Sequence, residues 1–543
     1  MAELERGALP ARLWRAIAAS LIALATVSVW STARVFSGTV DEPAHLAAGM
    51  QWLTTGAYTY DLQHPPLGRV AAALGPFMRG ERARGASGVY DEGSALLGTG
   101  PHYVETLASA RHGEIVFFVM LAIVVWAWGR RLIGDIGAGL AVLFVVTNPN
   151  LLAHAGLATT DIACAATTTL ALYLAVVWID RPSWTNTIAF GAAIGLAVAS
   201  RLSSVAFLGA AFMSCYALRA WARRAWSFGS ELDAARWTAR MAGAVVVLGV
   251  IVWTVYRFDV GRLSPNGMLV PAPAFIAGID RFLLHGGSGH PSFLLGRPGN
   301  HGWWYYFPVA LAVKTPLPLL LFSVAGGFDA LRAVRARRDW PTAVPLVAAV
   351  AMLAVAMVVR VDLGIRLVLP IYALLAIVAA QGTLALVHQT PAIAARASVA
   401  ALCAWSMVTV ARSYPDHLAY FNALAGDHPE RILVDSNLDW GQDLYRLRDT
   451  IVARGIRDSV RVAYFGTADL TAAGVPNARL LGLHERASGW IAASETYLAG
   501  EWVGGAYAWL LEQPPEARIG PSMRLWHIPP SRASSVTTDS SRR

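Results

Sequence analysis

Two adjacent acids, Asp41 and Glu42, closely follow the first long apolar run of the chain, which extends from Ala16 to Ala33. Carboxylates at the mouth of a membrane helix are costly, because the loss of water disfavours their charged form. Acids at such a place often serve proton transfer or ion binding, and we expect chemistry of this kind here. A helix cap is the alternative role of Asp41, since Pro43 and an alanine-rich run come directly after the pair.

Further polar residues follow the acid pair in the same stretch, namely His45, Asp61, His64 and Arg69. The segment QHPPLGR ends at Arg69, and its two prolines predict an extended entry into the next helix, with His64 and Arg69 as flanking donors. An interfacial turn with a snorkelling arginine is the alternative. Asp161 opens a later apolar run, where it either takes part in chemistry or caps the helix.

Lys314 is the single lysine among 44 basic side chains. A composition so biased towards arginine indicates that this position requires an ammonium group, and a compact charge suits a phosphate oxygen in a tight site. Chance retention of one lysine is the alternative. An aromatic run that includes Trp303, Trp304 and Tyr305 precedes Lys314, and it predicts an interfacial belt or the rim of a lipid or sugar pocket.

The composition is that of a membrane protein, with 55% hydrophobic and 15% charged residues. An ordinary soluble domain has about 25% charged residues. Apolar runs of membrane-spanning length recur, and we predict about eleven transmembrane helices. They lie near residues 14–35, 112–130, 136–151, 161–179, 186–200, 203–219, 241–258, 304–327, 342–359, 365–387 and 394–412. One bent helix is the alternative for the two short ranges that meet near Arg201.

The basic clusters orient the chain. They comprise Arg130-Arg131, Arg219 to Arg240 and Arg332 to Arg338, which lie in short connections that the positive-inside rule places in the cytoplasm. The outer loops 36–111 and 259–303 and the segment after Arg412 then lie outside. The net charge of +9 therefore reflects the orientation of the chain in the membrane. The sequence has no basic face interleaved with aromatic residues, which excludes nucleic-acid binding. A cleaved signal peptide ending near Ala33 is the alternative for the first span.

Three regions follow from these patterns. Residues 1–413 form an all-α polytopic membrane domain. Beyond it, short apolar runs alternate with charge and predict a small extracytoplasmic α/β domain over 414–530. Residues 531–543 have the composition of a disordered tail. The three cysteines lie inside apolar segments, which excludes a disulfide framework and a zinc site.

Six motifs between Asp41 and Leu444 carry a resemblance to a known class: DEPAH, QHPPLGR, TTDIA, WWYYFPVALAVKTP, LGIRLVLP and SNLDWGQDL. The chain resembles the GT-C membrane glycosyltransferases, in particular the dolichyl-phosphate-mannose–protein mannosyltransferases (glycosyltransferase family 39) and their bacterial, phospholipid carrier-dependent relatives. The resemblance implies a general base at Asp41, supported by Glu42. The residues that it implies as ligands of the donor phosphate are Lys314, Arg366, Arg69 and Arg201. The residues that it implies for the substrate pocket are His45, His64, Asp161, Trp303, Trp304 and Tyr305.

The activity implied by the resemblance is transfer of a sugar, mannose or a similar one, from a polyprenyl-phosphate donor by an inverting mechanism. The acceptor is a protein, lipid or envelope polymer at the outer face of a bacterial-type cytoplasmic membrane. The large soluble insert of the protein mannosyltransferases is missing, so a protein acceptor is not specifically implied. A divalent cation, Mg²⁺ or Mn²⁺, bound by Glu42 and Asp161 is the candidate cofactor.

Two other classes use the same residues. A transporter or flippase for a lipid-linked saccharide would bind with these charges without turnover, although no repeat of halves is visible in the sequence. A non-catalytic structural subunit is disfavoured by the intact acid pair. The motif SNLDWGQDL has no assigned role, and a calcium loop starting at Asp435 fails because its sixth residue is Trp440 and its twelfth is Arg446.

Overall fold

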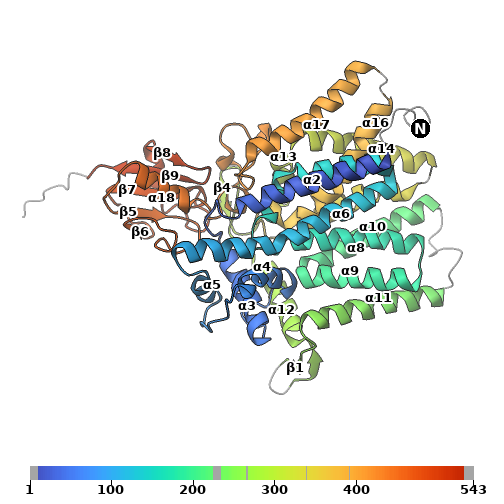
Figure 1. Ribbon diagram of the computed structural model, residues 1–543, viewed down its shortest axis with the longest axis horizontal. Coiled ribbons are helices and arrows are strands. Elements are labelled where there is room, and N and C mark those ends of the chain that lie inside the picture. The colour runs from blue at the N-terminus through green and yellow to red at the C-terminus, as the bar shows by residue number, and fades with distance from the viewer. Residues whose placement is uncertain (1–9, 224–233, 264–266, 338, 390–391, 531–543) are drawn as a thin grey trace, which may run out of the picture.

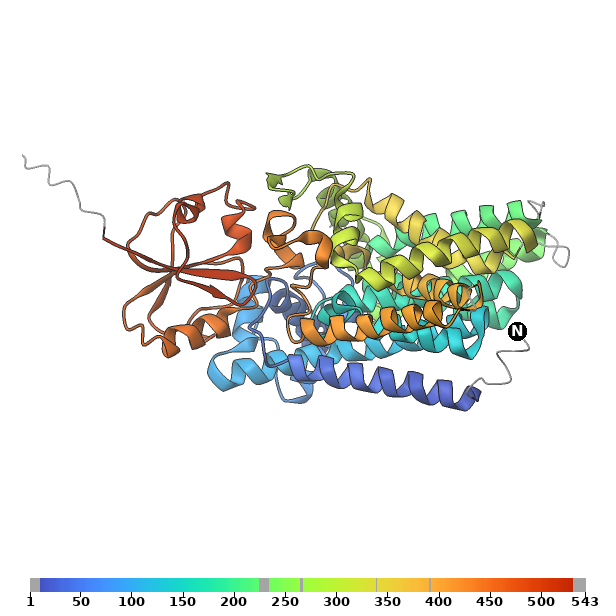
Figure 2. The ribbon, with the colours of Figure 1, turned by 90° about the horizontal axis from the view of Figure 1, so that it is seen from above.

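The computed structural model describes residues 10–223, 234–263, 267–337, 339–389 and 392–530. Long helices run side by side in a bundle, and the C-terminal residues form a small sheet domain at one end of it (Figures 1 and 2). We call this end of the bundle the domain end. The N-terminal end of α2 (Ala11–Thr32) lies at the opposite end (Figure 1). The predicted tail 531–543 lies outside the described residues.

Eight of the described helices are long and apolar enough to cross a membrane. They are α2, α6 (Gly100–Val146), α8 (Asp161–Asp180), α10 (Ser203–Arg223), α11 (Ala234–Val255), α14 (Leu317–Arg337), α16 (Leu369–Gln389) and α17 (Ile393–Ser413). Two shorter apolar helices are α9 (Trp184–Ser200) and α15 (Val344–Ala356). The predicted fold class, a helical polytopic membrane protein with a small C-terminal α/β part, is confirmed.

A sharp turn divides α6 into two helices. The backbone leaves the helical region at Ile133 and at Gly134, whose φ of 74° favours glycine. The second half then packs against the first, since a Cβ on Gly129 would lie 3.2 Å from the Cα of Ala138. The two halves correspond to the predicted ranges 112–130 and 136–151, so each of the eleven predicted ranges contains a helix.

The structure decides one open alternative and corrects one expected span. α9 ends at Ser200 and α10 begins at Ser203, so the alternative of one bent helix is wrong. The expected span 304–327 is broken into α13 (Tyr306–Lys314) and α14. Pro316 causes this break, because the residue before a proline avoids the helical region, and Thr315 accordingly has an extended ψ of 133°.

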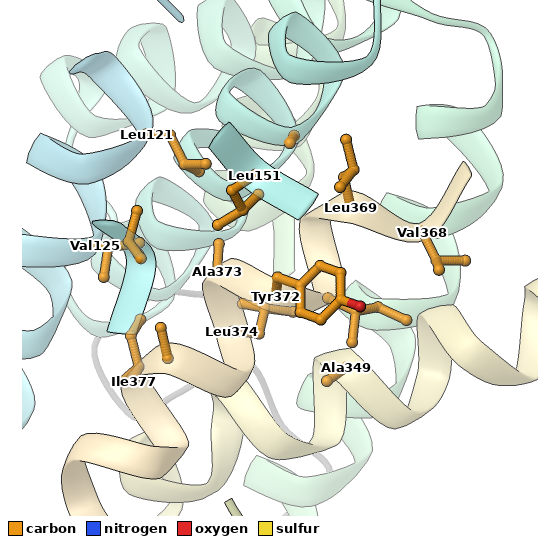
Figure 3. Packing of buried hydrophobic residues seen from close by; sticks show 14 of the residues in the cluster. Leu121, Val125, Leu151, Ala349, Val368, Leu369, Tyr372, Ala373, Leu374 and Ile377 are labelled. Atoms are coloured by element: carbon orange, nitrogen blue, oxygen red, sulfur yellow. The ribbon is translucent and has the colours of Figure 1, made fainter. Parts of the chain in front are cut away.

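The core of the bundle is built around α16. Its buried side chains, which include Leu369, Tyr372 and Ile377, pack against α6 and α7 (Pro149–Ala155) (Figure 3). On another side α16 contacts α14 and α15. A helix that is apolar all round is buried among other helices, and α16 is such a helix. Its first residues lie at the domain end, where the surrounding helices hold them in place.

Shorter elements cover the domain end. They are α3 (Glu42–Thr55), α4 (Pro66–Met78), α5 (Val89–Leu97), α12 (Pro273–Ser288), the 3₁₀ turn η2 (Ile365–Val368), the β1–β2 hairpin (Val260–Arg262, Leu269–Pro271) and the β3–β4 hairpin (Ser292–Leu294, Arg297–Gly299). α3 begins where Pro43 provides a helix-compatible φ, and it ends at Gly56, whose φ is 77°. Among them, α3 packs against α4 and α5, and the β1–β2 hairpin lies beside α12.

A five-stranded mixed sheet in the order β6-β5-β7-β9-β8 forms the centre of the C-terminal domain. Its strands are β5 (Val460–Ala463), β6 (Ala478–Leu480), β7 (Gly489–Ser494), β8 (Ala517–Ile519) and β9 (Met523–Ile528). β5 is parallel to β6 and β7, whereas β9 is antiparallel to β7 and β8. α18 (Leu444–Ala453) packs on the sheet through Leu447 and Ile451, and α19 (Glu495–Leu498) follows β7 directly.

Candidate active site at the domain end

A cavity of about 480 Å³ lies at the domain end of the bundle. Its polar lining comes mainly from α3, α4 and η2 and the segments beside them, with further residues from α10 and from α12 and the segment after it. It consists of Asp41, His45, Asp61, Gln63, His64, Arg69, Tyr90, Arg201, Ser203, His285, His290, Arg366 and Asp435. Its apolar lining comes largely from the near ends of α10 and α15 and includes Ala206, Phe207, Val355, Val359 and Leu367. A cavity with these two kinds of lining suits a molecule with a charged head and an apolar tail.

Asp41 and Arg366 form an ion pair in this cavity. Nη1 of Arg366 donates a hydrogen bond of 2.9 Å to Oδ2 of Asp41. Asp41 stands at the N-cap position of α3, as the alternative interpretation expects, but its side chain makes no capping hydrogen bond. The Asp41 side chain is 25% exposed, which leaves its carboxylate accessible from the cavity. The predicted base and one predicted phosphate ligand are thus brought together.

Asp161 holds two arginines side by side beneath this pair. Its Oδ1 pairs with Nη1 of Arg201, and its Oδ2 lies 4.0 Å from Nη1 of Arg366 and accepts a 2.9 Å hydrogen bond from Thr159. Both arginines line the cavity. In the described part of the chain, Nη2 of neither arginine has a hydrogen-bond partner, so two charged donors remain available to an anion.

Arg69 is tied into the wall of the cavity. Its Nε donates to Nδ1 of His45 at 2.9 Å, its Nη1 donates to Tyr58 and to the carbonyl oxygen of Asp61, and its Nη2 pairs with the Asp61 carboxylate. The side chain is fully buried. With most of its donors used, Arg69 fixes His45 and Asp61 in position, and this geometry does not favour the expected phosphate contact.

His64 presents a neutral imidazole to the cavity. Burial, together with the charge of Arg69, lowers the pKa of His64 well below its ordinary value. Its ring lies edge-on to that of His45, with 5.6 Å between the ring centres. The buried Nδ1 of His64 has no hydrogen-bond partner within the described ranges. This atom is closed to the cavity and the other ring nitrogen, Nε2, lies 3.2 Å from Nε2 of Gln63, so the structure assigns His64 to the cavity wall and no substrate contact to its Nδ1.

The structure places Glu42 away from the cavity, and this corrects the expected catalytic and metal-binding roles. Both carboxylate oxygens accept 2.7 Å hydrogen bonds from Arg111, one from Nε and one from Nη2. The backbone N–H groups of Thr39 and Ala158 donate two more. Burial alone would raise the pKa of Glu42, but Arg111 holds this pKa below its ordinary value. Glu42 therefore fastens the start of α3 to α6.

Lys314 also has a structural place instead of the expected contact with a phosphate. The side chain is completely buried and does not line the cavity. Its Nζ donates hydrogen bonds of 2.7 Å and 2.6 Å to the carbonyl oxygens of Leu418 and Asn437, and it lies 4.4 Å from the ring centre of Phe421. The ammonium group thus links the end of α13 to two segments near the C-terminal domain. This geometry agrees with the inference that the position needs a compact cation. The partners of the ammonium group are backbone carbonyl oxygens, however, and not the expected phosphate.

The aromatic run before α13 does not reach the cavity either. Trp303, Trp304 and Tyr305 are missing from its lining, and Trp304 is 67% exposed. The backbone N–H of Trp303 donates to Asp362 at 2.6 Å. Phe307, two residues farther along, is the aromatic residue that lines the cavity. Of the two interpretations of this run, the exposed Trp304 favours the interfacial belt.

The C-terminal part contributes cavity residues that the sequence did not single out. Asp435, Trp440, Phe465 and Trp502 all line the cavity. Nε1 of Trp502 donates to Asp435 at 3.3 Å, and burial raises the pKa of Asp435 to about 6. Behind it Glu501 is 2% exposed, and burial raises its pKa well above the ordinary value, with a further rise from the charge of Asp435. Trp440 belongs to the motif SNLDWGQDL and Asp435 directly precedes it, so the density of polar residues there was the available signal, whereas Phe465 and Trp502 lie outside the motif.

The candidate metal ligands do not converge. Glu42 is saturated by Arg111 and by backbone N–H groups, and Asp161 is saturated by Arg201 and Thr159. Within the described ranges, no group of three or more His, Cys, Asp or Glu side chains is arranged to hold a metal ion. The residues therefore do not fit the expected divalent cation, and no step of the reaction is assigned to one.

Comparison with known proteins identifies the fold. A sequence model of the dolichyl-phosphate-mannose-protein mannosyltransferase family matches residues 104–253. No curated protein matches the chain. The crystal structure of ArnT from Cupriavidus metallidurans bound to undecaprenyl phosphate aligns over 93% of this chain and 97% of its own, with a TM-score of 0.50 and 14% identity. This is the GT-C fold.

A second GT-C structure aligns similarly. The Archaeoglobus fulgidus oligosaccharyltransferase, tethered with an acceptor peptide, matches 90% of this chain and 71% of its own, with a TM-score of 0.50 and 11% identity. The resemblance to the GT-C class that the motifs carry is confirmed. Within this GT-C chain the residues matched by the family model include Asp161 and Arg201, whereas Asp41 and Arg366 lie outside them.

Proposed function

We propose that the protein is a membrane glycosyltransferase that moves a sugar from a polyprenyl-phosphate donor to a hydroxyl acceptor. The observation that carries this proposal is the Asp41–Arg366 pair, which places a proton acceptor and a cation 2.9 Å apart in a cavity that also has apolar walls. Sugar transfer from a lipid phosphate needs a base at the acceptor and cations at the leaving group. Both requirements are met within one cavity.

In the proposed reaction Asp41 removes the proton from the acceptor hydroxyl. The acceptor oxygen forms the new bond to the anomeric carbon from the side opposite the phosphate. The bond between that carbon and the phosphate oxygen breaks, and its electron pair leaves with the polyprenyl phosphate, so the configuration inverts. Arg201 and Arg366, whose Nη2 groups face no protein partner among the described residues, stabilise the charge on the departing phosphate.

The lipid part of the donor would lie along the apolar lining. The near ends of α10 and α15 contribute Ala206, Phe207, Val355 and Val359, and Ala206 and Val359 are exposed on the bundle surface. ArnT, which has the same fold, was crystallised with undecaprenyl phosphate. An apolar wall that continues to the lipid-facing surface allows a long isoprenoid chain to remain in the membrane while its phosphate reaches the two arginines.

We infer further that the domain end faces the outside of a cytoplasmic membrane. The described basic residues of these connections, on the turn of α6 and on the ends of α10, α11 and α14, lie at the opposite end (Figure 1), as the positive-inside rule requires for the cytoplasmic side. Mannose or a similar sugar is the proposed donor sugar, in line with the matched mannosyltransferase family. The acceptor is a protein, a lipid or an envelope polymer.

A reconstitution experiment tests the proposal. Purified protein in lipid vesicles is incubated with mannosyl-phosphoundecaprenol and with membrane extracts as the acceptor source, and release of undecaprenyl phosphate is measured together with the labelled product. We expect release that depends on both donor and extract. The same measurement on a panel of other undecaprenyl-phosphate sugars identifies the donor. Absence of release with every donor would contradict the proposed activity, and facilitated movement of the donor across the vesicle without release would establish a flippase.

A further inference from the structure

We propose that the segment Ser436–Leu444, here called the clasp, is the positioning element of the active site. The clasp contacts the backbone beside Asp41 and the backbone beside Arg366, and thereby sets the geometry of the pair. This inference rests on the proposed function, because it assigns a role in catalysis to residues that act through Asp41 and Arg366. The clasp carries the motif SNLDWGQDL, to which the sequence assigned no role.

The first contact of the clasp is with the segment before Asp41. The backbone N–H of Val40, the neighbour of Asp41, donates to the carbonyl oxygen of Trp440 at 3.1 Å. Ser37 makes three more bonds. Its backbone N–H donates to the carbonyl oxygen of Gln442 at 3.1 Å, its Oγ donates to that of Gly441 at 3.0 Å, and the same Oγ accepts from the backbone N–H of Leu444 at 3.1 Å. These bonds hold residues 37–40 in an extended course along the clasp, which fixes the point at which Asp41 enters α3.

The second contact is with the turn that carries Arg366. Oδ1 of Asn437 accepts a 3.0 Å hydrogen bond from the backbone N–H of Ile365, and Oγ of Ser436 donates to the carbonyl oxygen of Leu363. Between these two bonds, Gly364 has a φ of 98°, and a Cβ on it would lie 2.4 Å from Oγ of Ser436. Only glycine fits this place, so the turn and the clasp are matched to each other.

Trp440 completes the arrangement with its side chain. Its buried ring lies 4.4 Å from the guanidinium carbon of Arg366, which is a cation–π distance. The same residue therefore supports Arg366 with its ring and the neighbour of Asp41 with its carbonyl oxygen. One clasp residue thus contacts both sides of the pair.

The clasp is itself anchored in the C-terminal domain. Oδ2 of Asp439 accepts a 2.9 Å hydrogen bond from the backbone N–H of Thr496, and Oγ1 of Thr496 donates to the carbonyl oxygen of Asp439 at 3.1 Å. Lys314 holds the carbonyl oxygen of Asn437 from the bundle. Because the clasp is fixed from both parts of the protein, a change in one clasp side chain shifts the pair instead of the clasp as a whole.

A double-mutant cycle tests the clasp with undecaprenyl phosphate as the probe. Asn437→Ala removes the bond to Ile365 and also the bonds that Nδ2 of Asn437 donates to Tyr306 and Val434. Only the bond to Ile365 bears on the turn that carries Arg366, so we expect binding to weaken by about threefold to tenfold, the loss that corresponds to one hydrogen bond. Arg366→Ala should weaken binding further, and Asn437→Ala should then add nothing in the Arg366→Ala background. Asn422→Ala is the matched control, because Asn422 is a buried asparagine that holds the backbone of Ala312 and Thr315 away from the cavity. It should lower the thermal midpoint without changing affinity.

The outcomes separate the two proposals. If Asn437→Ala weakens undecaprenyl phosphate binding equally in the presence and absence of Arg366, the proposed role of the clasp is wrong. The proposed function would not be affected by this result. Unchanged affinity in Arg366→Ala would overturn the proposed function and the clasp with it. If Asn437→Ala does not fold, Ser436→Ala removes the bond to Leu363 instead, and Ser436→Thr should restore the affinity that Ser436→Ala loses. Failure of this rescue in folded protein would count against the clasp.

Discussion

Arg366 donates a hydrogen bond of 2.9 Å to Asp41 although 325 residues separate them in the chain. The same Nη1 lies 4.0 Å from Asp161, so one guanidinium on η2 joins the segment that follows α2 to the start of α8. An arginine shared by two carboxylates is held in one orientation. The other edge of the guanidinium is thereby directed at the cavity, where a phosphate would bind.

Asp41 is the residue whose loss should affect chemistry most directly. We expect Asp41→Asn to lower turnover by about 10²–10⁴, the usual contribution of a general base, while undecaprenyl phosphate binding stays within a few-fold of the wild type. Asp91→Asn serves as the control, since Asp91 is an exposed acid of α5 and does not line the cavity. Steady-state release of undecaprenyl phosphate measures the effect. Turnover at the wild-type rate in Asp41→Asn would move the base elsewhere.

Glu42 should behave as a structural residue despite its position beside Asp41. Glu42→Gln leaves the buried Arg111 without a counter-charge, and breaking a buried ion pair costs about 3–5 kcal/mol. We therefore expect a clearly lower thermal midpoint, with the remaining folded protein active. The double variant Glu42→Gln/Arg111→Met removes both charges and should recover part of the midpoint. A stable but inactive Glu42→Gln protein would restore the expected catalytic role.

The role of Lys314 can be decided by comparing stability with binding. Lys314→Met leaves two buried carbonyl oxygens without donors, at a cost of about 1–3 kcal/mol for each group. We expect a lower thermal midpoint in detergent, and Lys314→Arg should not restore it, because the larger fork overfills a fully buried site. Arg360→Met, at an exposed cation, is the control. A protein with Lys314→Met and a wild-type midpoint that no longer binds undecaprenyl phosphate would support the original phosphate assignment.

Asp439 predicts a pH dependence of stability. Burial raises the pKa of Asp439 to about 7, although hydrogen bonds from Thr496 oppose this rise. The pKa of an aspartate in the unfolded chain is about 3.9, so between these two pKa values the folded state retains a proton that the unfolded state releases. The stability that this proton contributes is fully present below about pH 4 and is lost as the pH rises to about 7. Asp439→Asn lacks this titration. Its thermal midpoint relative to the wild type should rise between pH 5 and pH 8, and a constant difference would contradict the shifted pKa.

The proposed orientation can be tested in intact cells. In a background without the three native cysteines, Ser459→Cys in the C-terminal domain should react with a membrane-impermeant thiol reagent. Ala336→Cys, at the opposite end of α14, should react only after the cells are opened. Both positions are exposed, so a difference reports the side of the membrane and not burial. Labelling of Ala336→Cys from outside would invert the proposed topology.

The sequence predicted the membrane part well because its signals are local. A helix that crosses a lipid bilayer must be long and apolar, and arginine clusters indicate the end at which it turns. The broken span before Lys314 shows the limit of this reasoning. The apolar run continues through Pro316, so hydropathy alone does not predict a break. α13 ends there because Thr315, the residue before the proline, avoids the helical backbone region.

The candidate site was predicted less completely, because partners of charged residues are distant in sequence. Asp41 and Arg366 were identified from their motifs, and the structure brings them together. Glu42 and Lys314 were predicted to take part in chemistry as well. In the structure, Glu42 is paired with Arg111, and Lys314 donates to the backbone carbonyl oxygen of Asn437. Residue type alone cannot tell whether a buried charge faces a cavity or another part of the fold. The contribution of Trp440 was missed for the same reason.

The bonds between Ser37 and the clasp have a consequence for biosynthesis. Ser37 and Gly441 are 404 residues apart, so the segment that follows α2 leaves the ribosome long before its partner exists. At a synthesis rate of about 5–20 residues per second, roughly 20–80 seconds pass between the two. During that time α2 can already be inserted and Glu42 can already fasten the start of α3 to α6, but Asp41 still lacks both Arg366 and the clasp. A nascent chain therefore cannot acquire transferase activity until translation is nearly finished, and truncated products inserted in the membrane remain inert.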